Sequence, residues 1–132
     1  MAGATALVLC LIAGGQPAVR VPADHFTLSW THSIEKVEWQ EDYRITGEGL
    51  ILERSRVKGS GVGMEPAPDA KLIDGWWVGH PVLPPLPDLT LAASNHAGDH
   101  VICAQKRCAS LHDWLGGPVE GPVRMVACPI RD

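Results

Sequence analysis

Hydrophobic and polar side chains alternate strictly along one early stretch of the chain. Phe26, Leu28 and Trp30 fall on one face, and the serine and threonine side chains between them fall on the other. Alternation with a period of two is typical of a β-strand that buries one face. The parity of the alternation changes near residues 35–36, which predicts a bulge or a turn at that point.

The alternation resumes on both sides of a glycine-rich turn signal. Tyr43 and Ile45 precede Gly47-Glu48-Gly49, whose glycines permit a positive φ, and residues 50–57 alternate again after it. Successive strands joined by short turns indicate a β-meander. We further expect, in chain order, a loop rich in glycine and proline over 58–69, a short strand over 72–78, an extended proline-rich crossing over 80–87, a strand over 89–93 and a hairpin over 101–111.

These elements predict an all-β, mainly antiparallel fold. We expect a small single-domain meander that forms a sandwich or a partly open barrel, with long Gly/Pro-rich loops and no long helix. Five tryptophans against one phenylalanine and one tyrosine favour a core built around indole rings. A chain of 132 residues has room for one domain, which we place at residues 23–132, with 115–132 as a loose C-terminal tail or an edge strand.

Residues 1–22 are expected to form a signal peptide or another apolar leader. Residues 2–15 contain an apolar run of roughly ten residues followed by small ones, which is the length of a signal-peptide core and too short to span a bilayer. Because no lysine or arginine precedes the run, an internal strand remains the alternative. A leader implies export, so we expect a periplasmic or otherwise extracytoplasmic protein with no membrane span in its mature chain.

Three cysteines follow the predicted leader. Cys103 and Cys108 are separated by four residues, and a tight hairpin would bring their side chains within disulfide distance. This pair is the predicted disulfide, and Cys103 with Cys128 is the alternative. The stabilisation expected from loop entropy differs between the two pairings by roughly 1.5 kcal/mol, which is too little to choose between them. His96 and His100 could join the first two cysteines as four zinc ligands. Oxidation after export would consume those thiols, so we expect no metal and no other cofactor.

The charge pattern excludes one class of partner. The formal net charge is -4, and acidic and basic residues are interspersed along the chain. The sequence therefore has no concentrated basic face that could follow a phosphate backbone or an anionic lipid surface. Nucleic acid is not an expected partner.

The densest polar cluster lies at residues 31–41, directly after the first apolar strand face. A polar binding rim and a buried ion-pair network would both suit this position. A hydrolase that uses His32 and Ser33 with a nearby carboxylate is the alternative, but neighbouring strand residues point to opposite faces, whereas a catalytic triad must converge. We therefore favour a non-catalytic role. Residues 59–66 offer backbone N–H groups from several glycines but lack the spacing of a phosphate-binding loop.

Five runs of the sequence resemble one bacterial family. The runs FTLSWTHSIEKVEWQEDYRI, GSGVGMEP, DGWW, PPLPDLTLAAS and VICAQKRC span about residues 25–111 and are similar to the domain of unknown function 1850 family (DUF1850). Members are small envelope proteins, typically encoded beside TRAP-type (TAXI) solute transporters. The resemblance implies a transport-associated accessory or binding role, with a transporter subunit or a small polar or anionic ligand as the partner.

Two motifs make this resemblance specific. The first is His-Ser-x-Glu-Lys with a following Trp-x-Glu, and the second is Gly-Ser-Gly-x-Gly-Met-Glu-Pro. If these motifs mark a site, the resemblance implies that its ligand-binding residues are His32, Ser33, Glu35, Lys36, Trp39, Glu41, Ser60, Met64 and Glu65. No catalytic residue is expected among them.

Overall fold

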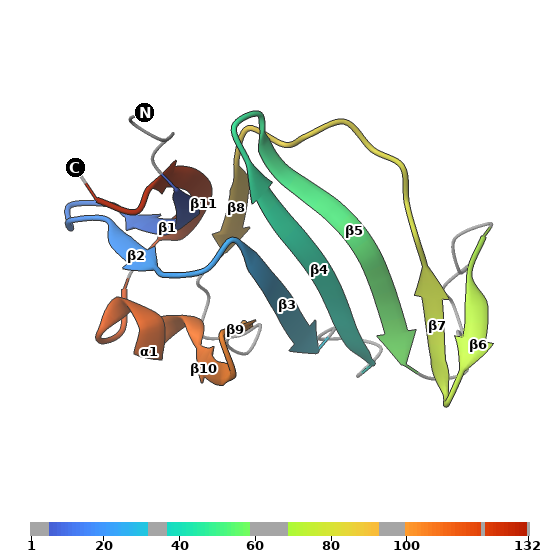
Figure 1. The fold of residues 1–132 in the computed structure, drawn as a ribbon. Coiled ribbons are helices and arrows are strands. Elements are labelled where there is room, and N and C mark those ends of the chain that lie inside the picture. The colour runs from blue at the N-terminus through green and yellow to red at the C-terminus, as the bar shows by residue number, and fades with distance from the viewer. Residues whose placement is uncertain (1–5, 32–36, 59–68, 93–99, 120, 132) are drawn as a thin grey trace.

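The structure is a computed structural model that describes residues 6–31, 37–58, 69–92, 100–119 and 121–131. Over these residues the chain forms two antiparallel β-sheets and one short helix (Figure 1). The prediction of an all-β, mainly antiparallel fold is confirmed, and the two sheets correspond to the sandwich form of that prediction. The described residues contain no helix that is long and apolar enough to cross a membrane.

The smaller sheet combines strands from both ends of the chain. In Figure 1 its strands gather near the two chain ends. Two of its strands, β1 (Leu7–Ala13) and β11 (Pro122–Pro129), are interior strands. The segment 115–132, which was expected to be a loose tail or an edge strand, therefore contains an interior strand, and that expectation is wrong. The order in the sheet is β2 (Val19–Val21), β1 (Leu7–Ala13), β11 (Pro122–Pro129) and β8 (Leu89–Ala92).

Strand β1 occupies the segment that the sequence pattern assigns to a leader. Leu9 and Leu11 are fully buried, and Ala13 is almost fully buried. In the structure this segment forms a strand of the smaller sheet, and the assignment of residues 1–22 to a leader stays a prediction. A signal-peptide core and a strand that is buried on both faces are both short apolar runs without a polar alternation. The sequence pattern alone therefore cannot distinguish the two.

Two disulfides link neighbouring strands. The predicted pair Cys103–Cys108 is confirmed, with its Cα atoms 4.0 Å apart. The second disulfide joins Cys10 of β1 to Cys128 of β11, with Cα atoms 5.9 Å apart and a sequence separation of 118. The alternative pairing of Cys103 with Cys128 is therefore wrong, and all four cysteines of the chain are paired.

The larger sheet carries the predicted meander as β3, β4 and β5, and the predicted cysteine hairpin as β9 and β10. β7 and β6 lie at the side of this sheet away from β1 and β11 (Figure 1). Over the described residues the order is β10 (Arg107–Ser110), β9 (Val101–Ala104), β3 (His25–Thr31), β4 (Glu38–Thr46), β5 (Gly49–Lys58), β7 (Trp76–Gly79) and β6 (Lys71–Ile73).

The bulge or turn predicted near residues 35–36 falls between β3 and β4. Thr31 at the end of β3 pairs with Glu38 at the start of β4, so the chain turns between these two residues. Residues 32–36 themselves lie outside the described ranges. A register shift against β5 occurs later, between Asp42 and Tyr43.

The single strand predicted over residues 72–78 is wrong. The segment forms a hairpin of β6 and β7, in which Ile73 pairs with Trp76 across a two-residue turn. The turn residues Asp74 and Gly75 have φ angles of 51° and 86°. Two positive φ angles define the type I′ hairpin turn, for which Asp-Gly is a preferred sequence.

The core between the two sheets is aliphatic rather than built around indoles. The expected tryptophan-rich core is wrong, because Trp30 and Trp114 are only partly buried and pack at the margin of the core. At this margin Trp114 can donate its indole N–H to the backbone carbonyl of Ile102, at 2.9 Å. The fully buried side chains come from both sheets and from α1 (Leu111–Leu115), and they are Leu9, Leu11, Val21, Leu28, Leu50, Ile102, Leu111, Val123 and Met125.

The predicted proline-rich crossing connects the two sheets. The chain leaves β7 in the larger sheet and reaches β8 in the smaller one (Figure 1). On the way, Leu86 makes a backbone pair with Leu50, with N–H to carbonyl distances of 2.8 and 2.9 Å. The crossing therefore packs directly against the turn that joins β4 to β5.

Candidate functional site

The structure describes two of the nine predicted ligand-binding residues, Trp39 and Glu41. Both lie on β4. Their surroundings can therefore be built from the register of the larger sheet. The other seven lie outside the described residues, and they are His32, Ser33, Glu35, Lys36, Ser60, Met64 and Glu65.

The register places Trp39 in a row of large apolar side chains that crosses the sheet. Directly paired residues share a face of a sheet. Trp39 pairs with Trp30 of β3 on one side and with Val57 of β5 on the other. Val57 pairs with Trp77 of β7, which pairs with Leu72 of β6. We call these five residues the indole row.

The indole row is a partly exposed continuation of the core face. Trp30 and Trp39 stack with ring centroids 6.0 Å apart and an interplanar angle of 9°. The ring of His100 lies 5.7 Å from that of Trp30. Trp30, Trp39 and Trp77 are each half-buried, and Leu72 at the sheet edge is 59% exposed. The row therefore offers flat aromatic surface that the core does not cover completely.

Trp39 also carries an unsatisfied donor. Its indole Nε1 is buried and has no hydrogen-bond partner among the described residues. Buried polar atoms in proteins are nearly always hydrogen-bonded, and an unpaired one costs roughly 1–3 kcal/mol. An acceptor supplied from outside the chain would remove this cost.

Glu41 lies one row nearer the core, between Leu28 of β3 and Ser55 of β5. Among the described residues, only Tyr43 hydrogen-bonds to its carboxylate, with the phenol donating to Oε1 at 2.9 Å. Burial raises the pKa of Glu41, and this effect exceeds the lowering by the Tyr43 hydrogen bond. Burial, followed by the charge of Glu41, raises the pKa of Tyr43 far above its usual range. A half-buried carboxylate on an apolar face is a common feature of functional sites.

We expect Glu41→Gln to remove the loss of stability that wild type suffers when this carboxyl is deprotonated. The pKa of Glu41 is higher in the folded state than in the unfolded state. The protonated carboxyl therefore contributes most to the free energy of unfolding below the usual pKa of 4.5, and this contribution is lost as the pH rises through the raised value. Relative to wild type, the variant should gain free energy of unfolding across that window. Urea denaturation between pH 4 and pH 8 would measure the difference.

The matched control is Glu48→Gln, which changes an exposed glutamate beside the β4–β5 turn. The control should leave the pH profile of wild type unchanged. If the free energy of unfolding of Glu41→Gln and that of wild type change in parallel with pH, ionisation of the buried Glu41 carboxyl does not destabilise the protein.

The zinc alternative has no support in the described structure. Cys103 and Cys108 are joined in a disulfide, so neither offers a thiolate. The described ranges contain no group of three or more His, Cys, Asp or Glu side chains placed to hold a metal ion.

The sequence predicts Trp39 and Glu41 as ligand-binding residues but does not predict the residues that share their face. The hairpin of β3 and β4 places Trp30 beside Trp39, and β5 and β7 bring Trp77 into the same row. The alternation patterns of β3 and β4 could have paired Trp30 with Trp39. The place of Trp77 depends on register across two further strand pairs, for which the sequence has no local signal.

Two antiparallel sheets, two disulfides and an aromatic face with one half-buried carboxylate define a small disulfide-bonded β domain. The family described as "Domain of unknown function (DUF1850)" matches residues 26–111, so the chain belongs to this family. The resemblance seen in the sequence is confirmed to that extent. Neither the curated proteins nor the solved structures include a significant match. The family match does not cover β1, β2 and β11, which are three of the four strands of the smaller sheet.

Proposed function

We propose that this protein is a non-catalytic binding module of the bacterial cell envelope. Its partner is a small polar or anionic ligand or a component of a TRAP-type solute transporter. The observation that carries the proposal is the buried indole N–H of Trp39, which no described residue satisfies, on the same half-buried face as the Glu41 carboxylate. In a face with a purely structural role, we would expect the indole N–H to have a hydrogen-bond partner and a half-buried carboxylate to be absent.

The chemistry of the face defines what it would bind best. Trp39 offers a donor, Glu41 offers an acceptor, and the rings of the indole row offer apolar surface. A polar ligand with an acceptor, a donor and one apolar face would satisfy all three. The motif residues outside the described ranges remain candidates on sequence grounds, and they are His32, Ser33, Glu35, Lys36, Ser60, Met64 and Glu65.

Location and partner have separate support. Two disulfides are typical of proteins that fold in an oxidising compartment, which favours the periplasm or another extracytoplasmic space. The association with a TRAP-type transporter rests on the resemblance to the family.

The test uses the full chain purified under native conditions from the periplasm. We expect native mass spectrometry to show an added ligand mass, or cross-linking in cells to capture a transporter subunit. Trp39→Phe keeps the aromatic plane and removes the donor, and Glu41→Gln keeps the size and removes the charge. Both should weaken binding, as should Lys36→Ala and Glu65→Ala.

Glu48→Gln serves as the control and should behave as wild type. The proposal fails if wild type shows neither an added mass nor a cross-link. It also fails if the four site variants change only the melting temperature and leave binding intact, because that result assigns the motifs a structural role.

A further inference from the structure

The other face of the larger sheet contains a groove of about 640 Å³. Thr27 and Asp42 line it, and they alternate along β3 and β4 with the residues that face the core. Gln105 and Lys106 of the β9–β10 turn line it from one side, and Arg54 and His80 line it from the other. The groove therefore lies on the opposite face of the sheet from the indole row.

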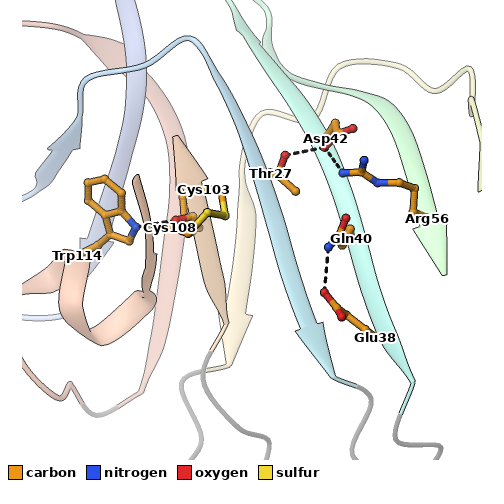
Figure 2. Close-up of a disulfide and its surroundings, with 9 residues drawn as sticks. Thr27, Glu38, Gln40, Asp42, Arg56, Cys103, Cys108 and Trp114 are labelled. Atoms are coloured by element: carbon orange, nitrogen blue, oxygen red, sulfur yellow. Dashed lines mark hydrogen bonds and ion pairs between the residues drawn. A yellow bond between two sulfur atoms is a disulfide. The ribbon is translucent and has the colours of Figure 1, made fainter. Parts of the chain in front are cut away.

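Asp42, on the floor of the groove, pairs with two guanidinium groups. Asp42 accepts a hydrogen bond from the Thr27 hydroxyl at 2.6 Å and ion pairs from Arg54 Nε at 2.6 Å and Arg56 Nη2 at 2.9 Å. Figure 2 shows Thr27, Asp42 and Arg56 converging on this face. One carboxylate thus faces two guanidinium groups, which leaves one positive charge uncompensated within the cluster.

The sides of the groove add two side chains, Lys106 and His80, whose polar ends have no partner among the described residues. Among the described residues, nothing forms a hydrogen bond or ion pair with the Lys106 ammonium or with the His80 ring. Glu53, the other acidic residue of the lining, pairs with Arg44 at 3.3 Å. Four cationic side chains, Arg44, Arg54, Arg56 and Lys106, lie in the groove or pair with its lining carboxylates Asp42 and Glu53, whereas the chain as a whole has a net charge of -4.

The turn that presents Lys106 is strained. Gln105 and Lys106 have φ angles of 49° and 67°, although neither is a glycine. The corresponding turn between β6 and β7 uses the favoured Asp74-Gly75. The disulfide Cys103–Cys108 closes the hairpin next to the strained turn (Figure 2). A strained backbone held in place by a crosslink is expected where a side chain serves a function.

We infer that this groove is an anion-binding site for a small molecule that carries a carboxylate or a phosphoryl group. Lys106 holds the anion from one side, the Arg54 guanidinium and the His80 ring hold it from the other, and the ion pair with Asp42 orients Arg54. The inference goes beyond the proposed function, because the two sites lie on opposite faces of the larger sheet.

The experiment uses the full chain with intact disulfides and two probes, inorganic phosphate and succinate. Isothermal titration calorimetry should show saturable binding of at least one probe, and the comparison of the two separates phosphoryl from carboxylate recognition. Sodium chloride at the same ionic strength should produce no such binding. Lys106→Met should weaken binding by about tenfold or more, because it removes a charge-assisted hydrogen bond. Lys71→Met, which changes an exposed lysine on β6 outside the groove, should not.

A second variant separates binding from folding. Replacing Gln105 by Asn and Lys106 by Gly gives the turn its preferred residues, so the melting temperature should rise while anion binding is lost. The inference is overturned if this double variant or Lys106→Met binds as wild type does. It is also overturned if chloride matches both probes. Trp39→Phe and Glu41→Gln should leave anion binding unchanged, so failure of one site does not imply failure of the other.

Discussion

Deleting residues 1–22 is expected to leave the chain without a cooperative fold. The deletion removes both β1 and β2, and with β1 it removes one of the two interior strands of the smaller sheet. The buried side chains of Leu9, Leu11 and Val21 are lost from the core. Burial of each contributes roughly 1.5–3 kcal/mol, and the total is comparable with the 5–15 kcal/mol that stabilises a typical domain.

Near-ultraviolet circular dichroism and urea denaturation would measure this effect. Deletion of residues 1–5 is the matched control, because it keeps Ala6, whose carbonyl accepts a hydrogen bond from the Ile130 backbone at 2.9 Å. The control should unfold cooperatively, close to the full chain. If the chain that starts at residue 23 unfolds cooperatively at the same urea concentration, residues 1–22 are dispensable, as a cleaved leader would be.

Gly49→Ala is expected to destabilise the protein by roughly 2–4 kcal/mol, a large effect for the addition of one methyl group. Gly49 has a φ of +125°, a conformation that side chains rarely adopt. A Cβ atom at this position would lie 2.2 Å from the carbonyl oxygen of Leu86. The clash would force apart the backbone pair of Leu50 and Leu86, which joins the proline-rich crossing to the larger sheet.

Urea denaturation would again provide the measurement, with Gly47→Ala as the control. Gly47 belongs to the same turn, but no atom lies within 4 Å of the position that its Cβ would take. The control should change the free energy of unfolding by no more than about 0.5 kcal/mol. Equal effects of the two substitutions would show that the contact with Leu86 is not a constraint on the fold.

The parts of the fold that could be predicted from the sequence depend on local patterns. The alternation of Phe26, Leu28 and Trp30 identified β3, and the glycines after Ile45 identified the turn between β4 and β5. The short separation of Cys103 and Cys108 was sufficient to predict both the hairpin and the disulfide that they form. In each case the residues that interact are close in the sequence, so their chemistry is visible in one window.

The features that were missed depend on contacts between distant segments. The pairing of β1 with β11, and with it the disulfide Cys10–Cys128, joins residues 118 positions apart. No local pattern distinguishes such a strand from other apolar runs. The hairpin of β6 and β7 is different, because Asp74-Gly75 is a strong local turn signal between two short apolar segments, from which this hairpin could have been predicted.

The candidate site follows the same division. Trp39 and Glu41 were identified from a sequence motif, and the structure shows that they share a face. The burial of Glu41 depends on Leu28 and Ser55 in neighbouring strands, so its raised pKa could not be derived from the sequence. The groove on the opposite face went unpredicted, because Lys106 and His80 have no common motif and meet only through the order of the strands.

The disulfide between Cys10 and Cys128 makes nearly the whole chain a covalent ring. A protease that cuts the backbone once, at any point between these two residues, would therefore not release a fragment. The cut chain would migrate as one species in a non-reducing gel and separate into two pieces only after treatment with dithiothreitol. A single cut would therefore leave the two pieces attached to each other and able to fold together again.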